Sequence, residues 1–267
     1  MKAHLHVAIV TFALLLLGGC TTIVQVPDDA NATLVTLPEA EAGYARVLDR
    51  HVNDLGEVAF EALRDDRSSV SGLPALERYV RAIGRTPLDG FSGNDARLAH
   101  MINGYNALSM YNVIASGIPE THAGLAKVRF FVTRQFLIAG KPLSLYAFEN
   151  DIIRKLDEPR VHFALNCSAV SCPVLPRKMF TTQGLNEALD RETRAFFERP
   201  ENLRVDDASR TIFFNEILSF YTQDFAPRHA LTLIEYAARY ASRDLPRHYA
   251  IAFTPYDWTI ANQRRKR

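Results

Sequence analysis

The densest group of chemically reactive side chains lies between residues 160 and 175. Cys167 and Cys172 flank a short polar loop there, and His162 stands shortly before the first of them. Cysteine thiolates act as nucleophiles or metal ligands, and two cysteines can also close a disulfide. A nucleophilic cysteine needs a nearby base, which a third group orients. The pattern is therefore compatible with a reactive thiol, a disulfide or a metal site.

Four interpretations of the two cysteines stay open. An oxidising compartment permits a disulfide between Cys167 and Cys172, provided that their Cα atoms lie within about 7 Å. The cysteines are alternatively reduced, buried and packed as apolar side chains, or one of them is a reactive thiol with His162 as its base. Zinc has the weakest support, because these residues supply three of the four ligands that a structural zinc ion needs. We favour the disulfide, and we expect no metal and no other cofactor.

A second group of polar residues lies on a helix predicted over residues 94–116. His100, Asn103 and Asn106 follow one another at three-residue steps and therefore share one face of that helix. If the fold brings this face to the cysteine loop, His100 could serve as the base, with Glu149 or Asn103 as the orienting group. The simpler interpretation, which we prefer, is that the buried asparagines hydrogen-bond to the backbone of neighbouring loops.

The first twenty residues predict a secretory signal peptide. Lys2 precedes an apolar run over residues 7–17, which is too short for a membrane-spanning helix of about twenty residues. The run ends in Leu17-Gly18-Gly19-Cys20, which resembles the bacterial lipobox. That resemblance implies cleavage before Cys20, acylation of Cys20 with palmitate or similar chains, and anchoring to a membrane. Thr21 follows in place of Asp, which implies the periplasm-facing side of the outer membrane.

Composition and charge narrow the class of protein. The chain is 48% hydrophobic and 23% charged, as is usual for a globular protein. A net charge of +1 without a basic, aromatic-rich stripe argues against nucleic-acid binding. The sequence contains no phosphate-binding glycine loop, serine-hydrolase elbow or His-Glu-x-x-His motif. We expect a signal peptide over residues 1–19, a lipidated tether over 20–40 and a single globular domain over 41–267.

The elements that must position these residues form an irregular mixture of helices and strands. Helical spacing and capping residues predict helices near residues 44–55, 76–83, 94–116, 144–156, 182–197 and 230–241. Aromatic and β-branched runs predict hairpins over residues 128–138 and 205–214 and a buried strand over 160–165. Because strands and helices do not alternate regularly, we expect an α+β fold with a mainly antiparallel sheet and packed helices.

Four motifs occur in the order and approximate spacing of a known family. They are Ile102-Asn103-Gly104-Tyr105-Asn106-Ala107, Pro142-Leu143-Ser144-Leu145 with Glu149, the cysteine segment, and Tyr256-Asp257-Trp258. Over roughly residues 44–262 the chain resembles the family catalogued as domain of unknown function 547, found in bacterial envelope proteins and plants. The name of that family implies no activity. The chain departs from the usual pattern at His100-Met101, where Phe-Trp is common, and at Asn150, where a histidine often follows the glutamate.

The long helix and its Gly117-Ile118-Pro119 ending are faintly similar to transglutaminase and papain-like scaffolds. In those scaffolds the helix carries the nucleophilic cysteine, whereas Asn103 stands at that position here. Since a fold alone does not decide function, we expect a non-catalytic envelope lipoprotein that binds an envelope protein or a cell-wall component. The alternative is a thiol-dependent hydrolase or transferase that uses Cys167 or Cys172 with a histidine.

Overall fold

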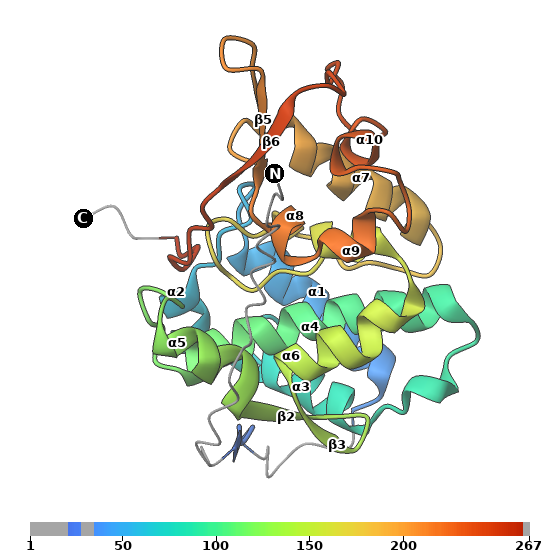
Figure 1. Cartoon of the computed structure of the whole chain (residues 1–267). Coiled ribbons are helices and arrows are strands. Elements are labelled where there is room, and N and C mark those ends of the chain that lie inside the picture. The colour runs from blue at the N-terminus through green and yellow to red at the C-terminus, as the bar shows by residue number, and fades with distance from the viewer. Residues whose placement is uncertain (1–20, 28–34, 264–267) are drawn as a thin grey trace.

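The computed structural model describes residues 21–27 and 35–263 of the chain (Figure 1). Its α-helices are α1 (Leu37–His51), α2 (Phe60–Asp65), α3 (Leu73–Arg85), α4 (Asn94–Ala115), α5 (Leu125–Val128), α6 (Leu145–Ala147), α7 (Leu185–Glu198), α8 (Ile217–Phe220), α9 (Thr222–Phe225) and α10 (Leu233–Ala237). Segments η1 (Leu88–Gly90), η4 (Ile153–Leu156) and η5 (Pro159–Phe163) are 3-10 helices, and η2 (Arg129–Thr133) and η3 (Phe148–Ile152) are π-helical. The strands are β1 (Thr22–Ile23), β2 (Arg134–Ile138), β3 (Lys141–Ser144), β4 (Leu203–Asp206), β5 (Thr211–Asn215) and β6 (Ala250–Thr254).

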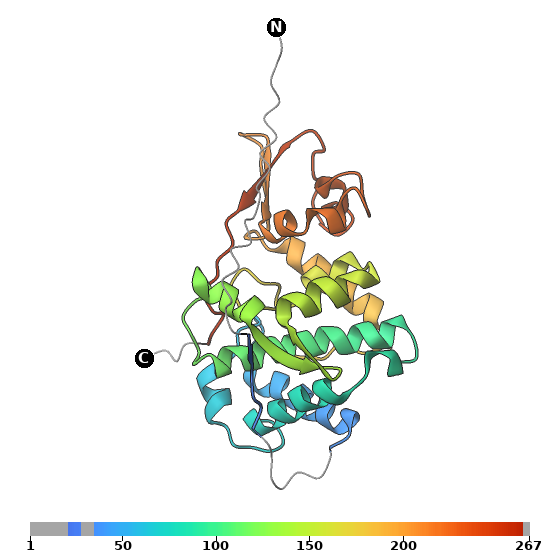
Figure 2. The ribbon, with the colours of Figure 1, turned by 60° about the horizontal axis from the view of Figure 1, so that its bottom comes forward.

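The strands form two small sheets in different parts of the molecule. In the first sheet, β2 pairs with β3 in an antiparallel hairpin and with β1 in parallel. In the second, β5 pairs with β4 in an antiparallel hairpin and with β6 in parallel. Figure 2 shows the second sheet and α10 at one end of the molecule and α1 and α3 at the other. The predicted α+β class is confirmed: each sheet is a hairpin with one parallel strand added, and the helices pack around them.

Helix α4 runs through the middle of the molecule (Figure 1). Every residue from Leu98 to Val113 is buried, as is typical of a core helix that is covered on all sides. Helix α3 packs against α4 and against α1, where the rings of Tyr44 and Tyr79 stack with their centroids 4.7 Å apart. Buried side chains from both halves of the chain form one hydrophobic core. The polar groups on α4 are therefore kept from water and need partners within the protein.

Two predicted strands are helical in the structure. The first hairpin begins only at Arg134, because its two-residue turn falls at Ala139 and Gly140, whose φ angles are +50° and +80°. The preceding aromatic run, 129–133, is π-helical and buries Phe130. The prediction of a buried strand over 160–165 was wrong, because Pro159 opens a 3-10 helix whose first turn is capped by the Glu158 carboxylate.

Part of the predicted tether belongs to the folded domain. Val24 is buried and donates its backbone N–H to the carbonyl of Gln135 at 2.8 Å. Helix α1 begins at Leu37 after a capping box formed by Thr36 and Glu39, so the predicted boundary at residue 41 falls inside it. The predicted signal peptide and Cys20 lie outside the described residues. Within the described residues, no helix has the length and apolar character that crossing a bilayer requires.

Candidate functional site

A small cavity of about 50 Å³ lies beside the cysteine loop. His162, Glu149 and both cysteines line it, so the structure brings together four of the residues that the sequence singled out. They come from separate elements: His162 from η5, Glu149 from η3, and the cysteines from the loop that follows η5. The aromatic rim of the cavity, as we name it, consists of Phe131, Phe220, Tyr256 and Trp258.

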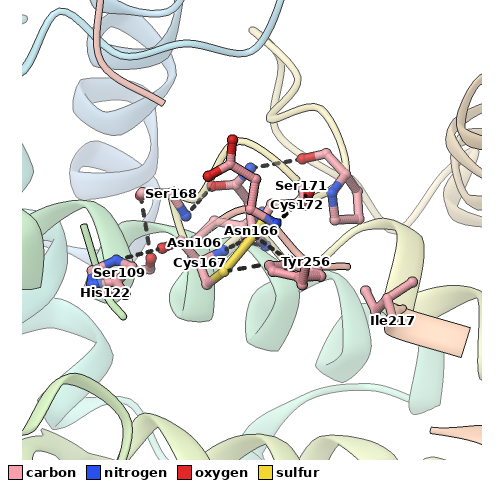
Figure 3. Close-up of a disulfide and its surroundings, with 12 residues drawn as sticks. Asn106, Ser109, His122, Asn166, Cys167, Ser168, Ser171, Cys172, Ile217 and Tyr256 are labelled. Carbon is pink, nitrogen blue, oxygen red and sulfur yellow. Dashed lines mark hydrogen bonds between the residues drawn. A yellow bond between two sulfur atoms is a disulfide. The ribbon is translucent and has the colours of Figure 1, made fainter. Parts of the chain in front are cut away.

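Cys167 and Cys172 are joined by a disulfide in this structure (Figure 3). Their Cα atoms are 6.3 Å apart, within the range that a disulfide spans without backbone movement. The sulfur of Cys172 accepts hydrogen bonds from the Cys167 backbone N–H at 3.0 Å and from the Tyr256 hydroxyl at 3.1 Å. The same hydroxyl lies 3.7 Å from the Cys167 sulfur. The tyrosine therefore covers the disulfide on the side of the cavity.

Asparagine side chains fix the conformation of the cysteine loop (Figure 3). Asn106 of α4 donates to the Ala164 carbonyl at 3.0 Å and accepts the Asn166 backbone N–H at 2.8 Å. Asn166 in turn donates to the Pro173 carbonyl at 2.7 Å and accepts the Ser168 N–H at 2.7 Å. Buried backbone groups that no sheet or helix pairs are thus satisfied, and the loop is held on both sides of Cys167.

Glu149 places a buried carboxylate among three tyrosine hydroxyl groups. Tyr105 donates to Glu149 at 3.0 Å. Burial first, and then the nearby carboxylate, raise the pKa values of Tyr105, Tyr221 and Tyr256 above the usual range. All three hydroxyl groups therefore stay protonated at neutral pH, and they serve as hydrogen-bond donors around the cavity.

His162 is held by an ionised acid. Its Nε2 lies 2.7 Å from Asp224 Oδ2, and its ring stacks on Tyr221 with the centroids 4.0 Å apart. Arg154 binds the same carboxylate with two nitrogen atoms, at 2.6 and 2.7 Å, and is itself bonded to Asn150. Burial opposes ionisation of Asp224, but the hydrogen bonds from His162 and Arg154 outweigh it and hold the pKa of Asp224 well below its usual range. A carboxylate that orients a histidine is an arrangement that acid–base catalysis and purely structural sites both use.

The structure does not bring His100 or Asn103 to this cavity. Asn103 donates to the Phe180 carbonyl at 2.7 Å and accepts the Phe180 N–H at 2.9 Å, so its amide holds a loop. His100 is buried against the ring of Phe91, with Nδ1 3.8 Å from a carboxylate oxygen of Glu41. Both residues line a different, open hollow between α1, α4 and residues 177–183.

Comparison with known proteins finds one family model that matches part of the chain. Residues 88–197 match the family described as Protein of unknown function, DUF547. The match covers α4, Glu149, His162 and both cysteines, while the Tyr256-Asp257-Trp258 motif lies beyond it. It supports the resemblance that the motifs predicted. No curated protein and no solved structure matches the chain.

Several residues in or next to the cavity were not predicted from the sequence. Tyr105 and Tyr256 stand in the motifs that carry the family resemblance, but their types alone did not mark them as partners of Glu149 and the disulfide. Asp224 and Tyr221 lie in no motif, and they reach His162 only through the fold. Among the described residues, no cluster of three or more His, Cys, Asp or Glu side chains could hold a metal ion.

Proposed function

We propose that the chain is a lipid-anchored protein of the bacterial envelope that binds an envelope protein or a cell-wall component without transforming it. The observation that carries the non-catalytic part is the bond between Cys167 and Cys172. While the bond is intact, neither sulfur is a thiolate, and only a thiolate attacks an electrophile. His162, the nearest imidazole to the disulfide along the chain, is engaged by Asp224. The cavity therefore offers hydrogen-bonding groups without a free thiol nucleophile.

The anchor is supported by the Leu17-Gly18-Gly19-Cys20 tetrad behind a short apolar run. A disulfide fits the same location, because the periplasm keeps such bonds oxidised. Outer-membrane attachment facing the periplasm is the location that Thr21 after the cysteine favours.

The aromatic rim supports a binding role. The rings of Tyr256 and Trp258 lie with their centroids 4.4 Å apart, and Phe220 stacks near Trp258 at 6.1 Å. The Lys127 ammonium lies 3.8 Å from the centroid of Trp258. Aromatic faces beside hydroxyl donors suit a ligand that has both an apolar face and hydrogen-bonding groups, as sugars and peptide side chains do.

Two measurements test this function separately. Metabolic labelling with a fatty-acid analogue should mark the wild-type protein and leave a Cys20→Ala variant unlabelled. Equal labelling of the variant contradicts the anchor. For the site, iodoacetamide should label neither Cys167 nor Cys172 in the native protein until a reductant is added.

A thiol-dependent hydrolase or transferase is the second candidate, favoured by one observation. Both cysteines line the same cavity as His162 and Glu149, so reduction would release a thiol beside an oriented histidine. Rapid labelling of the unreduced native protein near neutral pH, abolished by His162→Ala, would support this candidate and overturn the non-catalytic one.

A further inference from the structure

An exposed apolar stripe lies on the helical stretch that α5 and η2 form together. Leu125 is 88% exposed, Val128 49% and Val132 47%. The three side chains are spaced by three and four residues, so they share one side of the helix. Phe130 points to the other side and is buried. One side of the stretch thus packs on the core, while the other side exposes large apolar side chains to solvent.

One arginine lies within the stripe and a second follows it along the chain. Arg129 is exposed and follows Val128 directly, and Arg134 begins β2 two residues after Val132. Scattered single hydrophobic residues on a surface need no explanation, but a contiguous row of them marks an interaction site. Apolar side chains flanked by arginine are typical of helices that lie at the interface of an anionic bilayer.

The first described residues of the chain lie beside the strand that follows this stripe. Thr22 of β1 pairs with Arg134, and the neighbouring Ile23 is 41% exposed. Cys20 precedes Thr22 by two residues, a length of chain that spans at most about 7 Å. A lipid on Cys20 would therefore hold the bilayer within a short distance of β1 and of the residues that pair with it.

We propose that this face, made of Ile23, Leu125, Val128, Arg129 and Val132 and called here the α5 face, rests on the surface of the bilayer that holds the anchor. The inference builds on the proposed lipid anchor. Close tethering keeps the α5 face at the bilayer surface, the apolar side chains enter the headgroup region, and Arg129 meets lipid phosphates. Phe131 of the aromatic rim belongs to the same helical stretch, so the cavity would open beside the membrane surface.

A fluorescent depth measurement tests the α5 face with a matched control. The full-length lipoprotein carries an environment-sensitive nitrobenzoxadiazole label on an introduced cysteine, Leu125→Cys or Leu231→Cys. Leu231 is 79% exposed and lies just before α10, which Figure 1 places at the upper right, away from α5 at the lower left. Vesicles of phosphatidylglycerol and phosphatidylethanolamine contain a lipid with a nitroxide headgroup as the quencher.

When the protein binds the vesicles, the emission maximum of the label at position 125 should shift to shorter wavelength. The nitroxide lipid should quench this label several-fold more strongly than the label at position 231. Adding Val128→Asp and Val132→Asp should reduce that quenching to the level at 231 while the protein still floats with the vesicles. Equal, weak quenching at both positions in floating protein overturns the α5 face and leaves the anchor standing. If the wild-type protein fails to float, both proposals are overturned.

Discussion

Replacing the cysteine pair tests how the loop beside the cavity is held. The two residues are separated by 5 positions along the chain, so the disulfide closes a short loop in the unfolded state. In the chain-entropy model, a loop of this length lowers the unfolded-state entropy enough to stabilise the fold by about 2 kcal/mol. The double variant Cys167→Ser and Cys172→Ser should lose about that amount, and its melting temperature should fall by roughly 4 to 8 °C.

Urea unfolding of the full-length protein, with and without dithiothreitol, provides the measurement. The reductant should lower the unfolding free energy of the wild type and leave that of the double variant unchanged. Serine can accept the hydrogen bonds that the Cys172 sulfur accepts from Tyr256 and from the Cys167 backbone, so the difference reports mainly the covalent link. A wild type that reductant does not destabilise, with thiols that react before unfolding, would refute the disulfide and the argument built on it.

Two further predictions concern buried polar groups. Asn106→Ala should lower the free energy of unfolding by about 2–4 kcal/mol, because it leaves the buried Ala164 carbonyl and the Asn166 N–H without their partner. Urea unfolding measures this loss. The exposed control Asn94→Ala should stay within about 0.5 kcal/mol of wild type. Burial lowers the pKa of His122 to about 4, below its value of 6.5 in the unfolded chain. This difference in pKa does not change the stability of the fold above pH 6.5. As the pH falls from 6.5 to about 4, it destabilises the fold progressively, by roughly 3 kcal/mol in all. Unfolding of His122→Gln should show a shallower acid slope, and an unchanged slope would contradict this assignment.

The sequence correctly predicted the elements that have clear start or stop residues. The long helix was predicted over 94–116 and spans Asn94–Ala115. Its N-cap is Gly93, which provides no side-chain cap, and Gly117-Ile118-Pro119 cannot continue the helix. Ser144 was predicted as a helix cap, and its side chain accepts the Ala147 N–H. The second hairpin also lies where β-branched and aromatic runs predicted it.

Local sequence patterns gave the wrong secondary structure for two segments, 129–133 and 160–165, whose conformation depends on tertiary contacts. Residues 129–133 have the composition of a strand, but the hairpin turn at Ala139-Gly140 leaves them outside the paired region. The apolar run around Phe163 is buried as predicted, yet periodicity alone does not distinguish a short buried strand from a short helix.

The site was predictable in its residue types and not in its geometry. Cys167, Cys172, His162 and Glu149 line one cavity, whereas His100 and Asn103 line a separate hollow between α1, α4 and residues 177–183. The cysteine loop could be recognised because His162, Cys167 and Cys172 lie close together along the chain. The partner of His162 is Asp224, 62 positions away, and no local pattern encodes such a contact.

The polar stripe on α4 hydrogen-bonds to the backbone of neighbouring segments. At three-residue steps, Asn103 binds the backbone of Phe180, Asn106 binds the cysteine loop, and Asn112 donates to the Phe130 carbonyl. Ser109 lies between them, 3.4 Å from the hydroxyl of Ser168. Asn106 and Ser109 thus both contact the cysteine loop, while Asn103 and Asn112 hold two other segments.

Two of those segments carry residues of the cavity: η2 carries Phe131 of the rim, and the cysteine loop carries Cys167 of the disulfide. Because a buried amide that lost its backbone partner would be costly, these segments have little freedom to move relative to α4. The central helix thus supports the cavity, and the disulfide closes the cysteine loop that α4 contacts at Ala164, Asn166 and Ser168. A site built in this way is preorganised, which favours binding by a fixed surface over a mechanism that requires the cysteine loop to open.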